Sequence, residues 1–178
     1  MTLDQFFNYS GWIIGVLGFI FGIWQYFNAQ SRPVIKDVRV NMRAMGSIAS
    51  GQRTTDVTSV SVSLENKGAQ PVKCTGLVQF PRISAIPLHV QARGLVQQSD
   101  APFLLDGKDE MNLVGAWDIQ PSGTIGMGSI PYKDFVREYL PATVVITFGR
   151  REIRKILSEH DVVAAYHEFE KQSFRMGA

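Results

Sequence analysis

The sequence predicts a mainly β fold, an antiparallel sandwich or small barrel with a C-terminal helix, preceded by one N-terminal transmembrane helix. Two observations lead to this class. Residues 1–30 carry a single charged side chain, Asp4, within a strongly apolar segment. Residues 31–178 alternate apolar and polar side chains in short runs separated by turn residues, which is typical of half-buried strands. We therefore expect an N-terminal segment over 1–30 and a β-rich domain over 31–178.

Composition excludes some classes of protein. All 18 Lys and Arg and 15 of the 16 Asp and Glu lie after residue 30, a balance too even for a nucleic-acid-binding domain. The single cysteine, Cys74, excludes an intramolecular disulfide and agrees with a reducing compartment.

The first predicted element is a transmembrane helix at about residues 6–27. These 22 residues would extend ~33 Å at ~1.5 Å per residue, which matches a hydrocarbon core of ~30 Å. No face is polar, which disfavours a place on a globular surface. Aromatic residues stand near both ends, as in the interfacial belts of membrane proteins: Trp12, Trp24, Tyr9 and Tyr26. A buried core helix and a cleaved signal peptide remain as alternatives.

Flanking charges predict the orientation of this helix. Only Asp4 precedes it, whereas four basic residues follow within about 20 positions: Arg32, Lys36, Arg39 and Arg43. Basic residues favour the cytoplasmic side. We therefore expect a single-pass protein of the inner membrane, in contact with membrane lipid, with its N-terminus outside and its C-terminal domain in the cytoplasm.

Four glycines form one stripe along the predicted helix: Gly11, Gly15, Gly18 and Gly22. They make two G-x-x-x-G pairs, which allow close approach of a second helix. The stripe predicts a contact with copies of the same chain or with another membrane protein. The alternative is that glycine is simply commoner in membrane spans than in soluble helices.

The predicted strands follow in the β-rich domain. Alternation is clearest in "VIKDVRVNMR" and "TSVSVSLEN", and Asn66-Lys67-Gly68 supplies a turn after the second. Gly149-Arg150 joins the last two strands as a tight hairpin. In chain order the predicted strands cover residues 34–43, 58–66, 71–80, 84–92, 111–119, 124–130, 142–148 and 151–157.

The segments between and after these strands complete the prediction. Gly, Ser, Pro and Asp mark connectors at 44–56, 97–110 and 119–124. A short helix is expected at 132–139, after Pro131. A second helix is expected at about 158–172, because Ser158 and Asp161 form a capping box before an apolar face.

Three stretches carry a resemblance to a known family. "SLENKGAQPVKCTGLVQF", "WDIQPSGTI" and "ATVVITFGRREIRKIL" together resemble the strands and turns of immunoglobulin-like sandwiches on N-terminally anchored single-pass bacterial membrane proteins. The cysteine pair of antibody domains is missing, since Cys74 stands alone. The resemblance implies a binding or scaffolding module rather than an enzyme.

The search for catalytic or cofactor chemistry gives no strong candidate. Cys74 alternates with Val72 and is expected in the core, and His160 and His167 stand seven apart, which does not suit metal binding from one helix. The "DGKDE" loop at 106–110 lacks the calcium-loop order, and "GTIGMGS" at 123–129 lacks the lysine of a phosphate loop. We expect no enzyme, no cofactor and no metal.

One basic cluster remains as a candidate binding site: Arg150, Arg151, Arg154 and Lys155. Four cations this close suit contact with anionic lipid or with a phosphate group. The alternative is a solvated hairpin edge whose charges discourage edge-to-edge pairing.

Two functions follow from these features. The first is a non-catalytic, membrane-anchored interaction or scaffold module, whose β domain binds a cytoplasmic partner or ligand while the glycine-striped helix anchors and clusters it. The second is a membrane effector of bacterial defence type, whose β domain senses a nucleotide-like signal and whose helix assembles to disrupt the membrane.

Overall fold

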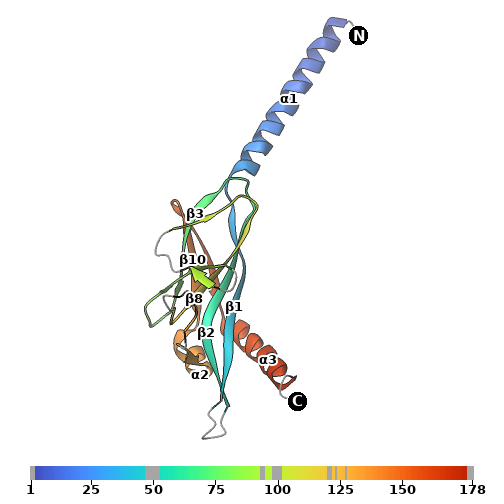
Figure 1. Ribbon diagram of the computed structural model, residues 1–178. Helices are drawn as coiled ribbons and strands as arrows, with labels where there is room; N and C mark the ends of the chain where they lie inside the picture. The colour runs from blue at the N-terminus through green and yellow to red at the C-terminus, as the bar shows by residue number, and fades with distance from the viewer. Residues whose placement is uncertain are drawn as a thin grey trace.

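The computed structural model describes residues 3–46, 53–92, 95–97, 102–119, 122, 124–126 and 128–175. The chain begins with α1 (Leu3–Ala29), continues into a β body, and ends with α3 (Glu159–Arg175). In Figure 1, α1 extends away from the β body, and the two chain ends lie at opposite ends of the molecule. The fold is therefore elongated, with the helix α1 as a separate projection.

The first sheet has six strands, five of them in the order β1-β2-β8-β5-β6. Its first two strands form a long antiparallel hairpin that runs from the base of α1 toward the opposite end of the body (Figure 1). Short β9 pairs with β2 beside it. The bounds are β1 (Pro33–Gly46), β2 (Arg53–Asn66), β5 (His89–Ala92), β6 (Leu95–Gln97), β8 (Glu110–Ala116) and β9 (Ile130–Pro131).

The second sheet has five strands, four of them in the order β11-β10-β3-β4, and β7 pairs with β3. All its pairings are antiparallel. The bounds are β3 (Val72–Gln79), β4 (Ile86–Pro87), β7 (Phe103–Leu105), β10 (Ala142–Phe148) and β11 (Arg151–Leu157).

Alternating side chains of both sheets form one hydrophobic core. Val60, Val62 and Leu64 of β2 are buried in the same cluster as Val144 and Ile146 of β10. Each such side chain contributes about 1.5–3 kcal/mol when it leaves water. The two sheets therefore pack as a sandwich, and the period-two pattern of the sequence faces inward as expected.

Helical segments cover one end of this sandwich. Residues 132–139, expected as one helix, form α2 (Tyr132–Asp134) and a π-helical turn, η1 (Phe135–Tyr139). Phe135 is fully buried and lies edge-on to Trp117. Helix α3 packs against β1, and its Val162 enters the core.

The strand predictions differ from the structure in several places. The predicted strand 84–92 is divided between β4 in the second sheet and β5 in the first, and the predicted connector 97–110 contains β7. Of the predicted strand 124–130, the described residues show only an isolated bridge at Ile125 and the start of β9 at Ile130. Strands 142–148 and 151–157 coincide with β10 and β11. The connector predicted at 44–56 is shorter, because β1 continues to Gly46 and β2 starts at Arg53. Residues 47–52 lie outside the described part of the chain.

The structure corrects the membrane part of the predicted fold. Over the residues that it describes, none of the helices combines the length and the apolar character needed to cross a membrane. The physical reason is the length of the uninterrupted apolar run, Gly11–Trp24, whose 14 residues extend only ~21 Å against a core of ~30 Å.

The dependent predictions fall with the transmembrane span. The single-pass transmembrane helix at 6–27 is wrong, and so is the location in the inner membrane, with the N-terminus outside and the C-terminal domain in the cytoplasm. The interfacial role predicted for Tyr9, Trp12, Trp24 and Tyr26 depended on that span and falls with it. Helix α1 itself is present and is longer than expected at both ends.

Candidate functional site

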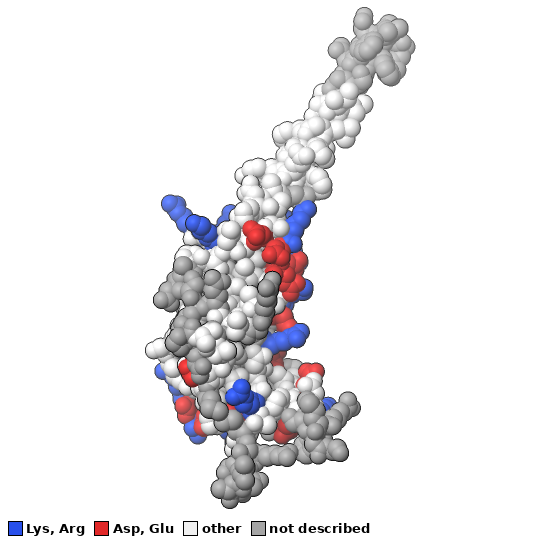
Figure 2. Space-filling model, in the orientation of Figure 1, with Lys and Arg blue, Asp and Glu red and all other residues white. Residues whose placement is uncertain are grey.

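Helix α1 displays a large apolar surface to its surroundings. Its described side chains from Trp12 to Phe27 are all exposed, and Trp12, Ile14 and Phe19 each reach 70% exposure. Figure 2 shows the described part of this projection without a single charged side chain. Monomeric proteins rarely expose a continuous apolar patch of this kind unless it binds something.

The predicted glycine stripe lies open on this helix. A Cβ atom built on Gly15, Gly18 or Gly22 would meet no neighbouring atom within 4 Å. Gly11 and Tyr9 fall outside the residues whose side chains the structure describes. The three described glycines therefore leave a strip of bare backbone that another helix can approach closely.

A buried asparagine holds the base of α1 on the sandwich. The Oδ1 atom of Asn66 accepts hydrogen bonds from the backbone N–H groups of Arg32 (2.9 Å) and Gly68 (3.0 Å). Its Nδ2 group donates to the carbonyl oxygens of Gln70 (2.8 Å) and Asp106 (3.1 Å). Asn66 is 0% exposed, so its whole hydrogen-bonding capacity is used inside the protein.

Two glycines allow this close packing at the helix base. A Cβ on Gly68 would lie against the backbone carbonyl of Gln30, and one on Gly107 would lie against the carbonyl of Ala69. Any larger residue at these positions would push the turns apart. The chain therefore packs against the sandwich through its backbone directly after α1, at Gln30.

Part of the predicted basic cluster lines a pocket beside this junction. A pocket of about 340 Å³ is lined by Gln30 and Ser31 directly after α1, by Gln70 and Val72, and by Phe148, Gly149, Arg150 and Arg151 of the β10–β11 hairpin. Gly149 has φ +58°, a left-handed conformation that glycine adopts readily. The turn places the two consecutive arginines at the helix base.

The structure separates the other two cations from this pocket. Arg154 forms an ion pair with Glu152 on its own strand, with Nη2 and Oε1 2.6 Å apart. The Lys155 ammonium donates to the carbonyl oxygen of Lys36 on β1, at 3.2 Å. The predicted cluster is thus divided: Arg150 and Arg151 line the pocket, whereas Arg154 and Lys155 contact other residues of the protein.

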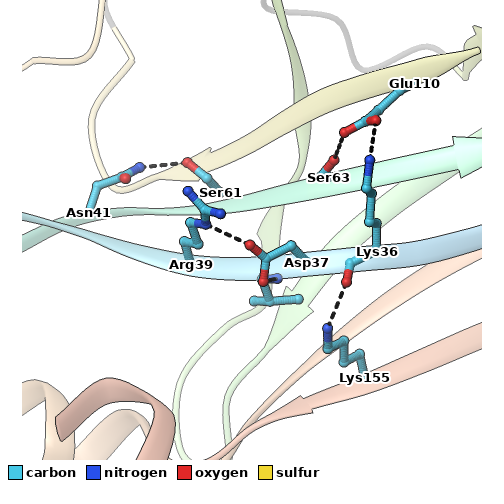
Figure 3. A network of polar contacts seen from close by, with 9 residues as sticks. Lys36, Asp37, Arg39, Asn41, Ser61, Ser63, Glu110 and Lys155 are labelled. Atoms are coloured by element: carbon cyan, nitrogen blue, oxygen red, sulfur yellow. Dashed lines mark hydrogen bonds and ion pairs between the residues drawn. The ribbon is translucent and has the colours of Figure 1, made fainter. Parts of the chain in front are cut away.

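A second polar surface covers the outer face of the first sheet. Figure 3 shows Lys36, Ser63 and Glu110 pointing toward one another from β1, β2 and β8. The Lys36 ammonium lies 2.6 Å from Glu110 Oε2, and the Ser63 hydroxyl donates to Glu110 Oε1 at 2.6 Å. These residues line an open groove of about 690 Å³.

The same face continues along β1. The Arg39 guanidinium bonds Asp37 at 2.6 Å, and Asn41 donates to the hydroxyls of Ser59 and Ser61. Figure 3 shows the Arg39 and Asn41 contacts side by side on the hairpin. The face is therefore a row of hydrogen-bonding groups that already satisfy one another.

These contacts shift ionisation in the expected directions. The hydrogen bond and the charge of Glu110 raise the pKa of Lys36, and the Lys36 and Ser63 donors lower the pKa of Glu110. The Arg39 donor likewise lowers the pKa of Asp37. All three groups are charged near neutral pH, which favours recognition of polar surfaces over acid–base chemistry.

The remaining chemical candidates lie apart from these surfaces. Cys74 is 1% exposed, and burial raises its pKa to about 11, so its thiol is protonated at neutral pH. Within the described residues no group of three or more His, Cys, Asp and Glu side chains is placed to hold a metal. His160 and His167 are exposed on α3.

The two loops considered for ligand binding serve local structure. Lys108 of "DGKDE" has φ +58°, and its N–H bonds Gly68, which ties this turn to the helix base. In "GTIGMGS", Gly126 and Gly128 lie against Asp118, while residues 123 and 127 fall outside the described part.

Sequence reasoning missed several residues of these surfaces. The sequence indicates Asn66 only as a turn residue, and its local pattern gives no sign that the side chain is buried and makes four hydrogen bonds. Gln30 and Ser31 gave no signal because polar residues after a helix are ordinary. Glu110 pairs with a lysine 74 positions away, which no local pattern reveals.

Comparisons with known proteins give no relative. No family model, curated protein or solved structure matches the chain. The immunoglobulin-like resemblance therefore stays a prediction about detail within a sandwich of two antiparallel sheets.

Proposed function

We propose that this chain is a non-catalytic interaction module that assembles with copies of itself through α1. The observation that carries the proposal is the exposed apolar surface of α1, whose following segment is hydrogen-bonded to the sandwich through Asn66. The sandwich then serves as the body that assembly brings together, with its polar face available to a partner or ligand.

The cost of leaving α1 exposed supports a binding role. Burying one large apolar side chain contributes about 1.5–3 kcal/mol. A helix that is apolar all round is stable in water only when other chains or elements cover it. The core cluster contains no described residue of α1, so the sandwich does not supply that cover.

The surface of α1 favours a second copy over an unrelated partner. One face carries the open glycines, whereas the opposite face carries bulky groups such as Ile13 and Ile20. Identical helices can therefore meet glycine to glycine with bulky groups on the outside. From Gln5 to Ser31 the chain is uncharged, so parallel copies meet no like-charge repulsion along this contact.

Two features of the body support a non-catalytic role. The only cysteine thiol is buried and protonated, which removes the usual activated nucleophile. The polar groups on the first sheet are paired with one another at 2.6–2.8 Å, rather than aimed at a shared reacting point.

Disulfide trapping in intact cells tests the proposal. Full-length chains carrying Gly18→Cys or Gly22→Cys are oxidised and compared with the matched controls Ile13→Cys and Ile20→Cys on the opposite face. Native Cys74 adds little background because it is 1% exposed. We expect at least five times more disulfide-linked dimer from the two glycine positions.

Two results would contradict self-assembly. Equal trapping at all four positions would show that collisions are random. A dominant cross-linked band containing a different protein would replace the second copy by another partner.

A further inference from the structure

We propose that the pocket at the base of α1 binds a phosphate group of a small soluble ligand, and that this binding promotes assembly through α1. The proposal of phosphate binding rests on the pocket alone. The assembly part rests on the proposed function above.

The pocket joins the helix to a basic hairpin. Gln30 and Ser31 directly follow the last turn of α1, and Arg150 and Arg151 come from the β10–β11 turn and the start of β11. Its volume of about 340 Å³ lies at the lower end of the range for small-ligand sites. A ligand seated there touches the body and the two residues that directly follow the helix.

Both arginines of the pocket have free guanidinium groups. The neighbouring carboxylate, Glu152, is already paired with Arg154 at 2.6 Å. Among the described residues, neither Arg150 nor Arg151 takes part in an ion pair or a side-chain hydrogen bond. Each therefore keeps its full set of donors for a ligand.

Phosphate matches this arrangement best among common anionic groups. A guanidinium presents parallel N–H donors that fit phosphate oxygens two at a time. Two adjacent guanidinium groups balance a dianion, and the polar residues Gln30, Ser31 and Gln70 also line the pocket.

The position of the pocket links the ligand to assembly. Parallel contact between α1 helices brings the bases of neighbouring copies to the same level. The unpaired cations Arg150 and Arg151 of neighbouring copies then lie at this common level, and their like charges oppose the contact. A bound phosphate neutralises them and removes that opposition.

The first experiment measures binding with inorganic pyrophosphate as the probe. Calorimetric titration compares the full wild-type chain with Arg150→Gln/Arg151→Gln. The matched control, Arg43→Gln/Arg82→Gln, removes two exposed arginines elsewhere on the body. We expect the pocket variant to bind at least tenfold more weakly and the control to match wild type.

The second experiment measures assembly with the Gly18→Cys disulfide. We expect pyrophosphate to raise the yield of linked dimer at least threefold in the otherwise native chain, and to have no effect after Arg150→Gln/Arg151→Gln. An unchanged yield with pyrophosphate bound would overturn the link to assembly. An absence of any dimer would overturn the proposed function, while the titration still decides the binding site.

A third arm identifies the source of the phosphate. Vesicles containing phosphatidylglycerol replace pyrophosphate as the probe. Retention of the chain by vesicles through Arg150 and Arg151, without pyrophosphate binding, would overturn the small-ligand assignment. Equal pyrophosphate affinity in all variants would overturn the site itself.

Discussion

Asn66 is the residue on which the geometry of the helix base depends. Its side chain bonds Arg32 just before β1, the β2–β3 turn at Gly68 and Gln70, and the β7–β8 turn at Asp106. An amide is suited to this place because it offers two donors and two acceptor sites in one plane. An aspartate at this position would replace the Nδ2 donor by a second oxygen, which would repel the carbonyl oxygens of Gln70 and Asp106.

We predict that Asn66→Ala lowers the free energy of unfolding by about 2–4 kcal/mol, because it leaves buried backbone groups without partners. Urea denaturation at a fixed protein concentration measures the change. Asn112→Ala, on the exposed face of β8, is the control and should change stability by less than about 0.5 kcal/mol. Equal effects of the two substitutions would contradict the role of Asn66.

The cap of α3 makes a prediction about pH. The Ser158 hydroxyl and N–H donate to Asp161, at 2.7 and 3.1 Å, and these bonds lower the pKa of Asp161. A carboxyl group whose pKa is lower in the folded state stabilises the fold above its unfolded pKa of about 4. This contribution is lost as the pH falls through the folded pKa.

Ser158→Ala is therefore expected to destabilise the chain by ~1 kcal/mol near neutral pH, and by less in acid. Urea denaturation at a series of pH values measures the difference from wild type. Ser84→Ala, at an exposed position without a described hydrogen bond, is the control. A difference that grows as the pH falls would contradict the assignment.

At the residue scale, the sequence predicted what neighbouring positions decide. The capping box could be predicted because Ser158 and Asp161 are three positions apart and interact within one helical turn. The hydrogen bonds of Asn66 could not be predicted, because its partners come from three separate segments of the chain. The same holds for the contact of Lys36 with Glu110, which only the order of the strands brings about.

At the scale of elements, alternation was a reliable guide where a strand packs on the core. Strands β10 and β11 matched their predicted limits because Ala142, Val144 and Ile146 alternate clearly. The hairpin of β1 and β2 extends beyond the residues that alternate between apolar and polar side chains. Backbone pairing such as that of Ala44 with Thr55 needs no core side chain. Two- and three-residue strands such as β4 and β7 are too short to show any period.

The membrane error also belongs to this scale. Phe6 and Phe7 were counted with the apolar run although Asn8 and Ser10 interrupt it. Helix formation tolerates such polar residues, whereas in a bilayer core an unpartnered polar side chain costs free energy. The helix was therefore predicted correctly, whereas its placement across a membrane was wrong.

The size of the glycines on α1 makes the third prediction. Gly15→Leu/Gly18→Leu fills the open strip with two bulky side chains, which should keep neighbouring helices apart. We expect at least a tenfold loss of dimer when the full-length chain is cross-linked through surface lysines and sized. Ile13→Leu/Ile20→Leu, on the opposite face, should leave the yield unchanged, and an equal loss there would contradict the stripe.

At the scale of the whole molecule, the core and α1 are separable. The described core cluster and the side chains packed on it begin at Ile35, after the helix has ended. Deleting residues 1–29 therefore should leave the strand content unchanged while abolishing assembly. Circular dichroism and sedimentation of the shortened and full chains measure the two effects, and loss of the strand signal would contradict the separation.

The elongated shape has one more consequence for such an assembly. Because α1 leaves one end of the body and α3 lies toward the other (Figure 1), parallel copies would all present the cleft between β1 and α3, about 600 Å³, in the same direction. A target with repeated epitopes could then engage several clefts at once. Avidity of this kind multiplies a weak single contact 10²–10⁴-fold without any new interaction.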